Sequence, residues 1–230
     1  MIMTRIVSEK FHCGNCGAEL SRPKTLSYFV RPGFPKPSEG LGQEYSMCPE
    51  CGYIAHDLSE PTSPERKAIL ESQEYKDQIR FGRYFCVEFH SYLLGFVAMK
   101  EERYEEAMIL YLKASQYNGY EFSNQMIQLV FDYLLERGVD GEAAADLSLQ
   151  GPAYAREKAI ECSELAHYDV ENGEFVHVHD LIDAQRKNGH FERAIQLAKQ
   201  RLGKQGEEHL SPMLEKQIAL SEARDAASEA

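Results

Sequence analysis

Cys-Gly-Asn-Cys-Gly at residues 13–17 and Cys-Pro-Glu-Cys-Gly at residues 48–52 decide how the first part of this 230-residue chain folds. In each stretch, two thiols reach one metal ion from a tight turn, and the glycine that follows lets the backbone reverse direction. Four thiolates complete the tetrahedral coordination that a structural Zn²⁺ ion prefers. The sequence therefore predicts one zinc ion bound by Cys13, Cys16, Cys48 and Cys51.

Iron is the main alternative metal. Rubredoxins resemble this pattern, because they also bind their ion through two such cysteine pairs. They are built around an aromatic core that usually includes Trp, and this chain has none. His12 and His56 flank the cysteine pairs, and we expect them to be neighbours because four thiolates already fill the site. A closed site of this kind leaves no position at which water could be activated.

The first sixty residues predict a small β module. Residues 25–30 are β-branched and aromatic, and residues 43–47 are a weaker strand candidate. Between them, residues 31–42 contain three prolines and three glycines, which indicates a loop. So small a module buries little apolar surface, and a bound metal would stabilise it. We expect a zinc-ribbon module over residues 1–60.

The second part, residues 61–230, has the pattern of a helical domain. Ser63 is placed to cap a helix that has Pro64 at its first position, and Thr62 with Glu65 offers an alternative capping box. Apolar residues then recur at steps of three to four, and glycines separate the periodic segments. Gly151-Pro152 is one of the expected breaks. Further helices are expected near residues 121–136, 153–168, 174–187, 191–202 and 210–224.

Residues 88–121 resemble a tetratricopeptide unit. The small and aromatic residues typical of its two helices are matched by Leu94, Gly95, Tyr104, Ala107, Tyr111 and Ala114. In such a pair, Gly and Ala leave space that aromatic side chains of the neighbouring helix fill. Residues 175–208 repeat the motif more weakly. The fold class is therefore expected to be mainly α, with a small N-terminal β zinc ribbon and a tetratricopeptide-like helical array.

The order of these modules is similar to that of a bacterial family catalogued as domain of unknown function 2225. The similarity is most specific at the second cysteine pair, which continues into Tyr53 and Ala55. The first pair lacks the proline expected there. The family has no established activity, so the resemblance implies an architecture and a bacterial cytoplasmic protein, and no chemistry.

Charge separates the two parts of the chain. Residues 1–60 carry 6 basic and 7 acidic residues, whereas residues 61–230 carry 19 and 30, a net charge of −11. An acidic surface repels phosphate backbones, so nucleic-acid binding is not expected of the helical part. It stays possible for the ribbon, whose basic residues are Arg22, Lys24, Arg31 and Lys36 among others. No apolar run has the length of a membrane span and no secretory signal is evident, so we expect a cytoplasmic protein with no membrane partner.

Two other groups of residues have chemistry of their own. Glu164-x-x-His167 and Glu174-x-x-His177 have the spacing of di-iron carboxylate helices, but they are only ten residues apart. Cys86 and Cys162 have no basic cluster beside them, and we expect both to be buried apolar side chains. No phosphate-binding loop, nucleophile elbow or dinucleotide fingerprint is present.

These patterns favour a non-enzymatic zinc-binding adaptor whose helical domain binds a protein partner. The residues expected to contact that partner interrupt apolar patterns or form an acidic cluster, and they are Glu88, His90, Ser91, Glu101, Glu102, Glu105 and Glu106. One alternative is a nucleic-acid-binding regulator that acts through the ribbon. The other is a metalloenzyme that uses the Glu/His pairs of the helical domain.

Overall fold

The structure is a computed structural model that describes residues 5–27, 45–85, 89–116, 138 and 141–227. The chain divides into two compact units, Met1–Lys76 and Asp77–Ala230. The sequence placed this boundary between residues 60 and 61, so the first unit extends further than expected. The predicted loop at 31–42 and the predicted helix at 121–136 lie outside the described residues.

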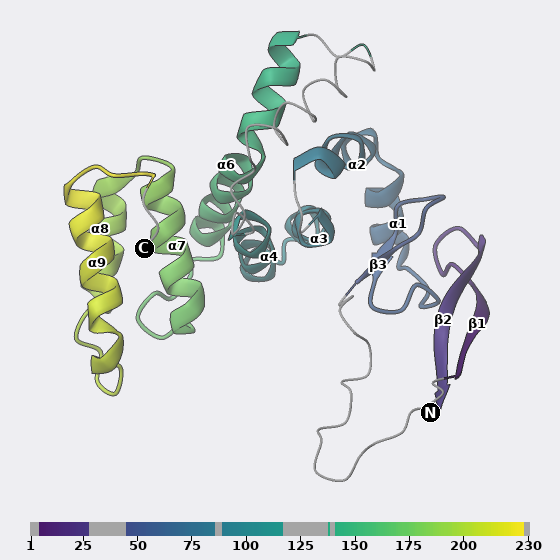
Figure 1. Ribbon diagram of the computed structural model, residues 1–230, viewed down its shortest axis with the longest axis horizontal. Coiled ribbons are helices and arrows are strands. Elements are labelled where there is room, and N and C mark those ends of the chain that lie inside the picture. The colour runs from purple at the N-terminus through teal and green to yellow at the C-terminus, as the bar shows by residue number, and fades with distance from the viewer. Residues whose placement is uncertain (1–4, 28–44, 86–88, 117–137, 139–140, 228–230) are drawn as a thin grey trace. The chain divides into compact units, whose positions relative to one another are not determined.

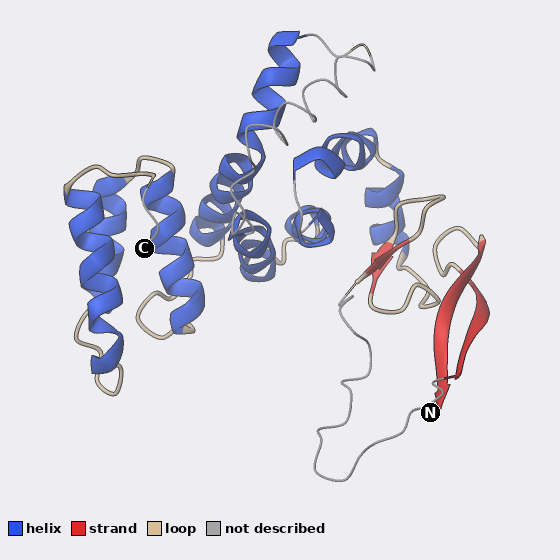
Figure 2. Cartoon of the chain, in the orientation of Figure 1, coloured by secondary structure: helices blue, strands red, loops and turns tan. Residues whose placement is uncertain are grey.

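The described residues of the first unit form two antiparallel pairs of strands. Figure 2 draws the strands in red. Strand β1 (Arg5–His12) pairs with β2 (Glu19–Ser27), and the first cysteine turn joins them. The short strand β3 (Ser46–Met47) pairs with β4 (Ile54–Ala55) across the second cysteine turn. Strand β1 was not predicted from the sequence, and residues 28–30 and 43–44 of the two predicted strands are not described.

Helical residues complete the core of this unit. Helix α1 (Pro64–Glu71) begins as predicted, because the hydroxyl of Ser63 accepts a hydrogen bond from the amide of Arg66. Leu70 of α1 and Tyr75 of α2 (Gln73–Phe85) are buried, as are Tyr53, Ile54 and Leu58 of the ribbon. The hydroxyl of Tyr75 donates a hydrogen bond of 2.8 Å to the carbonyl of Gly52. The ribbon therefore extends past residue 60 because its apolar core does.

The second unit is helical, and the successive described helices from α3 to α9 pack together (Figure 1). This confirms the mainly α fold with a small N-terminal β region. The tetratricopeptide arrangement itself stays a prediction. After residues 77–85 of α2, the described helices are α3 (Phe89–Lys100), α4 (Tyr104–Gln116), α6 (Gly141–Leu165), α7 (Phe175–Lys187), α8 (Phe191–Arg201), the 3₁₀ turn η1 (Glu208–Leu210) and α9 (Ser211–Glu222).

Helices α3 and α4 meet at Gly95, where the sequence predicted a close helix contact. A Cβ atom at Gly95 would lie 3.2 Å from the ring of Tyr111, which is tighter than ordinary packing. The ring of Tyr92 meets Tyr111 edge to face, with 5.7 Å between the ring centroids. Glycine is therefore favoured at this position by the approach of an aromatic side chain, and not by backbone conformation.

Helix α6 corrects one expectation. Gly151-Pro152 was expected to separate two helices, yet α6 runs without interruption from Gly141 to Leu165. A proline inside a helix removes one backbone hydrogen bond, and the continuous helix forgoes that bond. In the described parts of the chain, no helix combines the length and the apolar character needed to cross a membrane.

Candidate metal centre

The four predicted cysteines meet at one point of the first unit. The sulfur atoms of Cys13 and Cys51 are 3.8 Å apart, as are those of Cys16 and Cys48, and all four lie within 4.8 Å of one another. Bonds of about 2.3 Å from a central ion to a tetrahedron of sulfurs give edges of about 3.8 Å. A disulfide would bring two sulfurs to about 2.05 Å, so these are separate thiols. The group fits one four-coordinate metal ion.

The two cysteine turns have the same backbone structure. In the first, the amide of Cys13 donates to the carbonyl of Ala18 and the amide of Gly17 donates to the carbonyl of Cys13. The same two bonds recur in the turn that starts at Cys48, and all four measure 2.8 or 2.9 Å. The φ angle is 73° at both Gly17 and Gly52, a left-handed conformation that favours glycine. The glycine after each pair therefore serves the reversal that the sequence predicted.

The pKa values of the cysteine thiols indicate that the site favours a bound cation. Burial raises the pKa of Cys48 to about 12 and also raises the pKa of Cys51. Burial also opposes ionisation of Cys16, but hydrogen bonds from the Ala18 amide and from the other thiols lower the pKa of Cys16 overall. Buried thiols therefore favour the protonated form until a cation neutralises them. A divalent ion that binds here displaces protons, and its affinity falls as the pH falls.

The segment that follows strand β4 supports the first cysteine turn. The amide of Gly14 donates to the carbonyl of Leu58 at 2.7 Å, and the hydroxyl of Thr62 donates to the side chain of Asn15 at 2.9 Å. A Cβ atom at Gly14 would lie 1.9 Å from the carbonyl oxygen of Glu60, so only glycine fits. Sequence reasoning missed this contact, although a glycine directly after a ligand was a visible signal.

The histidines beside the turns do not join the group of sulfurs. Nδ1 of His12 lies 3.2 Å from the carbonyl oxygen of Gly17, and the ring of His56 packs on Tyr45 with 4.1 Å between centroids. Within the described ranges, no group of three or more His, Cys, Asp or Glu side chains is placed to hold a metal except the four cysteines. His12 and His56 therefore lie beside the group of sulfurs and not in it, as predicted.

The other proposed metal ligands are therefore not assembled into a site. Glu164 and His167 lie at the end of α6 and just after it, while Glu174 and His177 lie at the start of α7. Nδ1 of His177 is 3.9 Å from a carboxylate oxygen of Glu174, with no third ligand among the described side chains. Cys162 is buried as predicted, and burial raises the pKa of its thiol to about 11. Cys86 lies outside the described residues.

Arg22 bears on nucleic-acid binding by the ribbon. Its guanidinium contacts the carboxylates of Glu9 at 3.0 Å and Asp57 at 3.1 Å, and it lies over the ring of Phe11. The positive charge of Arg22 is therefore already paired with the carboxylates of Glu9 and Asp57. The side chains of Lys24, Arg31 and Lys36 lie outside the described part of the molecule.

The predicted partner-binding residues on α3 are only partly available. The side chain of Ser91 is 1% exposed, so its prediction as a contact residue is wrong. A polar residue that interrupts an apolar pattern had suggested an exposed position, but the hydroxyl is small enough to be buried in the helix core. His90 is half-buried, and Glu88 lies outside the described residues.

The acidic cluster at the turn between α3 and α4 is divided by its ion pairs. Arg103 contacts the carboxylates of both Glu101 and Glu106. Glu102 and Glu105 are exposed and have no ion pair among the described side chains. Two of the four predicted acidic residues are therefore exposed and outside the ion pairs of Arg103.

Comparison with known proteins identifies no relative. No protein-family model, curated protein or solved structure matches this chain. The resemblance to the bacterial family therefore rests on the cysteine pairs, Tyr53 and Ala55, and on the helices that follow them.

Proposed function

We propose that the first unit is a zinc ribbon with one structural Zn²⁺ ion and that the helical unit is a non-enzymatic adaptor for a protein partner. The observation that carries the proposal is the group of four thiols, whose sulfur atoms all lie within 4.8 Å of one another and in two pairs are 3.8 Å apart. Four protein ligands leave no coordination position for a substrate or a reactive water. The role that suits such an ion is to hold the two turns together.

Zinc rather than iron is supported by the composition of the unit. Both metals accept four thiolates at similar distances, so the geometry alone suits either. The chain has no Trp for a rubredoxin-like aromatic core. A reducing compartment keeps such thiols available to a metal, and we therefore place the protein in the cytoplasm. Membership of the bacterial family named above is part of the same proposal.

The metal assignment predicts about one zinc ion per purified chain. Replacement of Cys13, Cys16, Cys48 and Cys51 by Ser should abolish metal binding, because Ser offers no thiolate. Elemental analysis of the full chain measures this directly. Cys162→Ala is the matched control, since this thiol is buried in the other unit and should leave the zinc content unchanged. Iron in place of zinc, or zinc retained by the four-serine variant, would contradict the assignment.

The adaptor role is supported by the acidic helical unit and by the exposed carboxylates at the turn between α3 and α4. A protein segment that docks there should be basic or apolar, because an acidic one would meet like charge. Surface attraction of this kind is screened within about 8 Å at physiological ionic strength, so the encounter should slow as salt is added.

Charge reversal at this turn tests the adaptor role. The double variant Glu102→Lys, Glu105→Lys leaves both ion pairs of Arg103 in place, and it should lose a partner that the wild type captures from lysate of its own cells. Quantitative mass spectrometry of the captured proteins measures the loss. Glu215→Lys with Glu222→Lys in α9 makes the same change of net charge at exposed positions elsewhere and is the control. Equal recovery by both variants would exclude this surface, and salt-dependent capture of RNA or DNA would favour the nucleic-acid alternative.

A further inference from the structure

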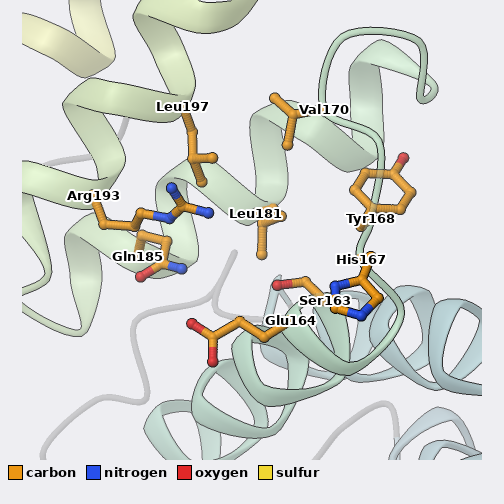
Figure 3. Close-up of a pocket in the computed structure, with 9 residues that line it drawn as sticks. All are labelled: Ser163, Glu164, His167, Tyr168, Val170, Leu181, Gln185, Arg193 and Leu197. Carbon is orange, nitrogen blue, oxygen red and sulfur yellow. The ribbon is translucent and has the colours of Figure 1, made fainter.

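A pocket of about 260 Å³ lies inside the helical unit, between the end of α6 and helices α7 and α8 (Figure 3). Its apolar lining comes from Val170, Leu181 and Leu197, all of them buried. Pockets for drug-sized ligands and cofactors typically range from about 300 to 1,000 Å³. This pocket therefore suits a molecule about as large as one amino acid.

One wall of the pocket presents hydrogen-bond donors. The side chain of Gln185 is 2% exposed, and its Oε1 lies 2.9 Å from Nδ1 of His190. Its amide nitrogen makes no hydrogen bond to the described residues, and Gln185 lines the pocket, so this donor is available to a ligand there. Beside it, Arg193 donates from one terminal nitrogen to Gln196 at 2.7 Å. Figure 3 shows the guanidinium of Arg193 and the amide of Gln185 on the same side of the pocket.

Glu164 supplies the opposite charge. It lines the same pocket, its side chain is exposed, and it has no ion pair or side-chain hydrogen bond within the described part of the chain. In Figure 3 its carboxylate lies below Gln185, with Leu181 above it. The pocket thus combines two donors, one carboxylate and an aliphatic lining within a space of one amino acid.

We propose that this pocket binds an aliphatic α-amino acid by its carboxylate. An amide N–H and a guanidinium are the donors that a carboxylate accepts from, and the pairing with Arg is charge-assisted. The aliphatic side chain lies against Val170, Leu181 and Leu197, where its burial is favourable. Glu164 accepts from the amino group. The proposal is independent of the zinc site and of the adaptor role.

Two sources could supply this chemistry, namely a free amino acid and the last residue of a peptide. Both have the α-carboxylate and the side chain, but only the free amino acid has an ammonium group to pair with Glu164. L-Leucine represents the first and N-acetyl-L-leucine the second. L-Leucinamide lacks the carboxylate and tests the shared feature.

Calorimetric titration of the full chain with the three compounds tests the proposal. L-Leucine, N-acetyl-L-leucine or both should bind, and L-leucinamide should bind at least about tenfold more weakly than the better of them, because it lacks the charge-assisted contact. If the wild type binds L-leucine more tightly than N-acetyl-L-leucine and Glu164→Gln abolishes this difference, the ligand is a free amino acid. If N-acetyl-L-leucine binds equally or more tightly, the ligand is the end of a peptide. Failure of both carboxylates to bind, or equal binding of L-leucinamide, overturns the proposal.

A variant of Arg193 separates binding from folding. Arg193→Gln should weaken the binding of the carboxylate ligand about tenfold or more, while thermal unfolding stays close to wild type because the residue is exposed. Lys199→Gln is the matched control, since Lys199 is an exposed cation of the same helix that does not line the pocket. Equal affinity of Arg193→Gln and wild type, with both folded, would also overturn the proposal.

Discussion

Removal of the metal by a chelator at neutral pH should unfold the first unit through α1, while the helices from α3 onward stay folded. The two cysteine turns come from distant parts of the sequence, and a bound ion would join them beside a core that includes Tyr53, Leu70 and Tyr75. Structural zinc contributes about 10–16 kcal/mol of apparent binding free energy in zinc-finger peptides, which exceeds the total stability of most domains. Hydrogen exchange followed by mass spectrometry, peptide by peptide, measures which segments lose protection.

The extent of the unfolded segment distinguishes two boundaries. Division after Lys76 predicts that α1 loses protection together with the strands, whereas a boundary near Pro61 predicts that α1 stays protected. Cys48→Ser is the control, because it should show the same exchange pattern without chelator and no further change with it. Loss of protection in α7 and α8 on chelation would show that the second unit depends on the metal too.

The sequence predicted the group of four cysteines well because each cysteine turn is specified by adjacent residues. Two residues between paired cysteines and a glycine after them determine each turn, and Gly17 and Gly52 have the positive φ angle that this role requires. The closure of the two turns around one point also followed from the ligand number of the metal. The contact between Gly14 and Glu60 did not follow, because it joins segments whose proximity arises only in the folded unit.

Helix positions were predicted closely where the periodicity is strong. The expected helices at 174–187 and 191–202 correspond to Phe175–Lys187 and Phe191–Arg201. Strand β1 was missed because its apolar residues, Ile6, Val7 and Phe11, do not alternate regularly with polar ones, and its pairing with β2 is what makes it a strand. The break expected in α6 shows the converse, since the surrounding helix persists through a glycine and a proline.

Buried polar side chains could not be predicted from the sequence at all. Arg186 and Arg201 read as ordinary basic residues in the last turns of their helices, yet both are buried. Both oxygens of Glu207 pair with Arg201, and two backbone carbonyls complete its contacts. Such residues are identified only when the groups that satisfy them are in place.

Arg186 joins α7 to α9 and to the segment after it. Its side chain is 0% exposed and donates to Gln217 at 3.0 Å, to Asp183 at 2.6 Å and to the carbonyl of Asp225. Burial opposes the ionisation of Asp183, but the contacts from Arg186, Lys187 and Gln217 outweigh it and lower the pKa of Asp183. The guanidinium of Arg186 therefore both donates hydrogen bonds and stabilises the ionised carboxylate of Asp183.

Arg186→Leu should lower the free energy of unfolding of the helical unit by about 3 kcal/mol. Removal of one partner from a buried ion pair typically costs about 3–5 kcal/mol, and the lower value applies because Lys187 still pairs with Asp183 at 3.0 Å. Urea unfolding followed by circular dichroism measures the change. Lys187→Leu is the control, on the same helix and also paired with Asp183, and it should cost less because the side chain of Lys187 is only partly buried.

The stabilising effect of the Asp183 carboxylate depends on pH. Because the pKa of Asp183 is lowered in the folded state, this stabilisation is present above the unfolded pKa of about 3.9 and is lost as the pH falls through the folded pKa. The difference between wild type and Arg186→Leu should therefore narrow in acid, and equal stability of the two proteins at neutral pH would show that this buried network contributes no net stability.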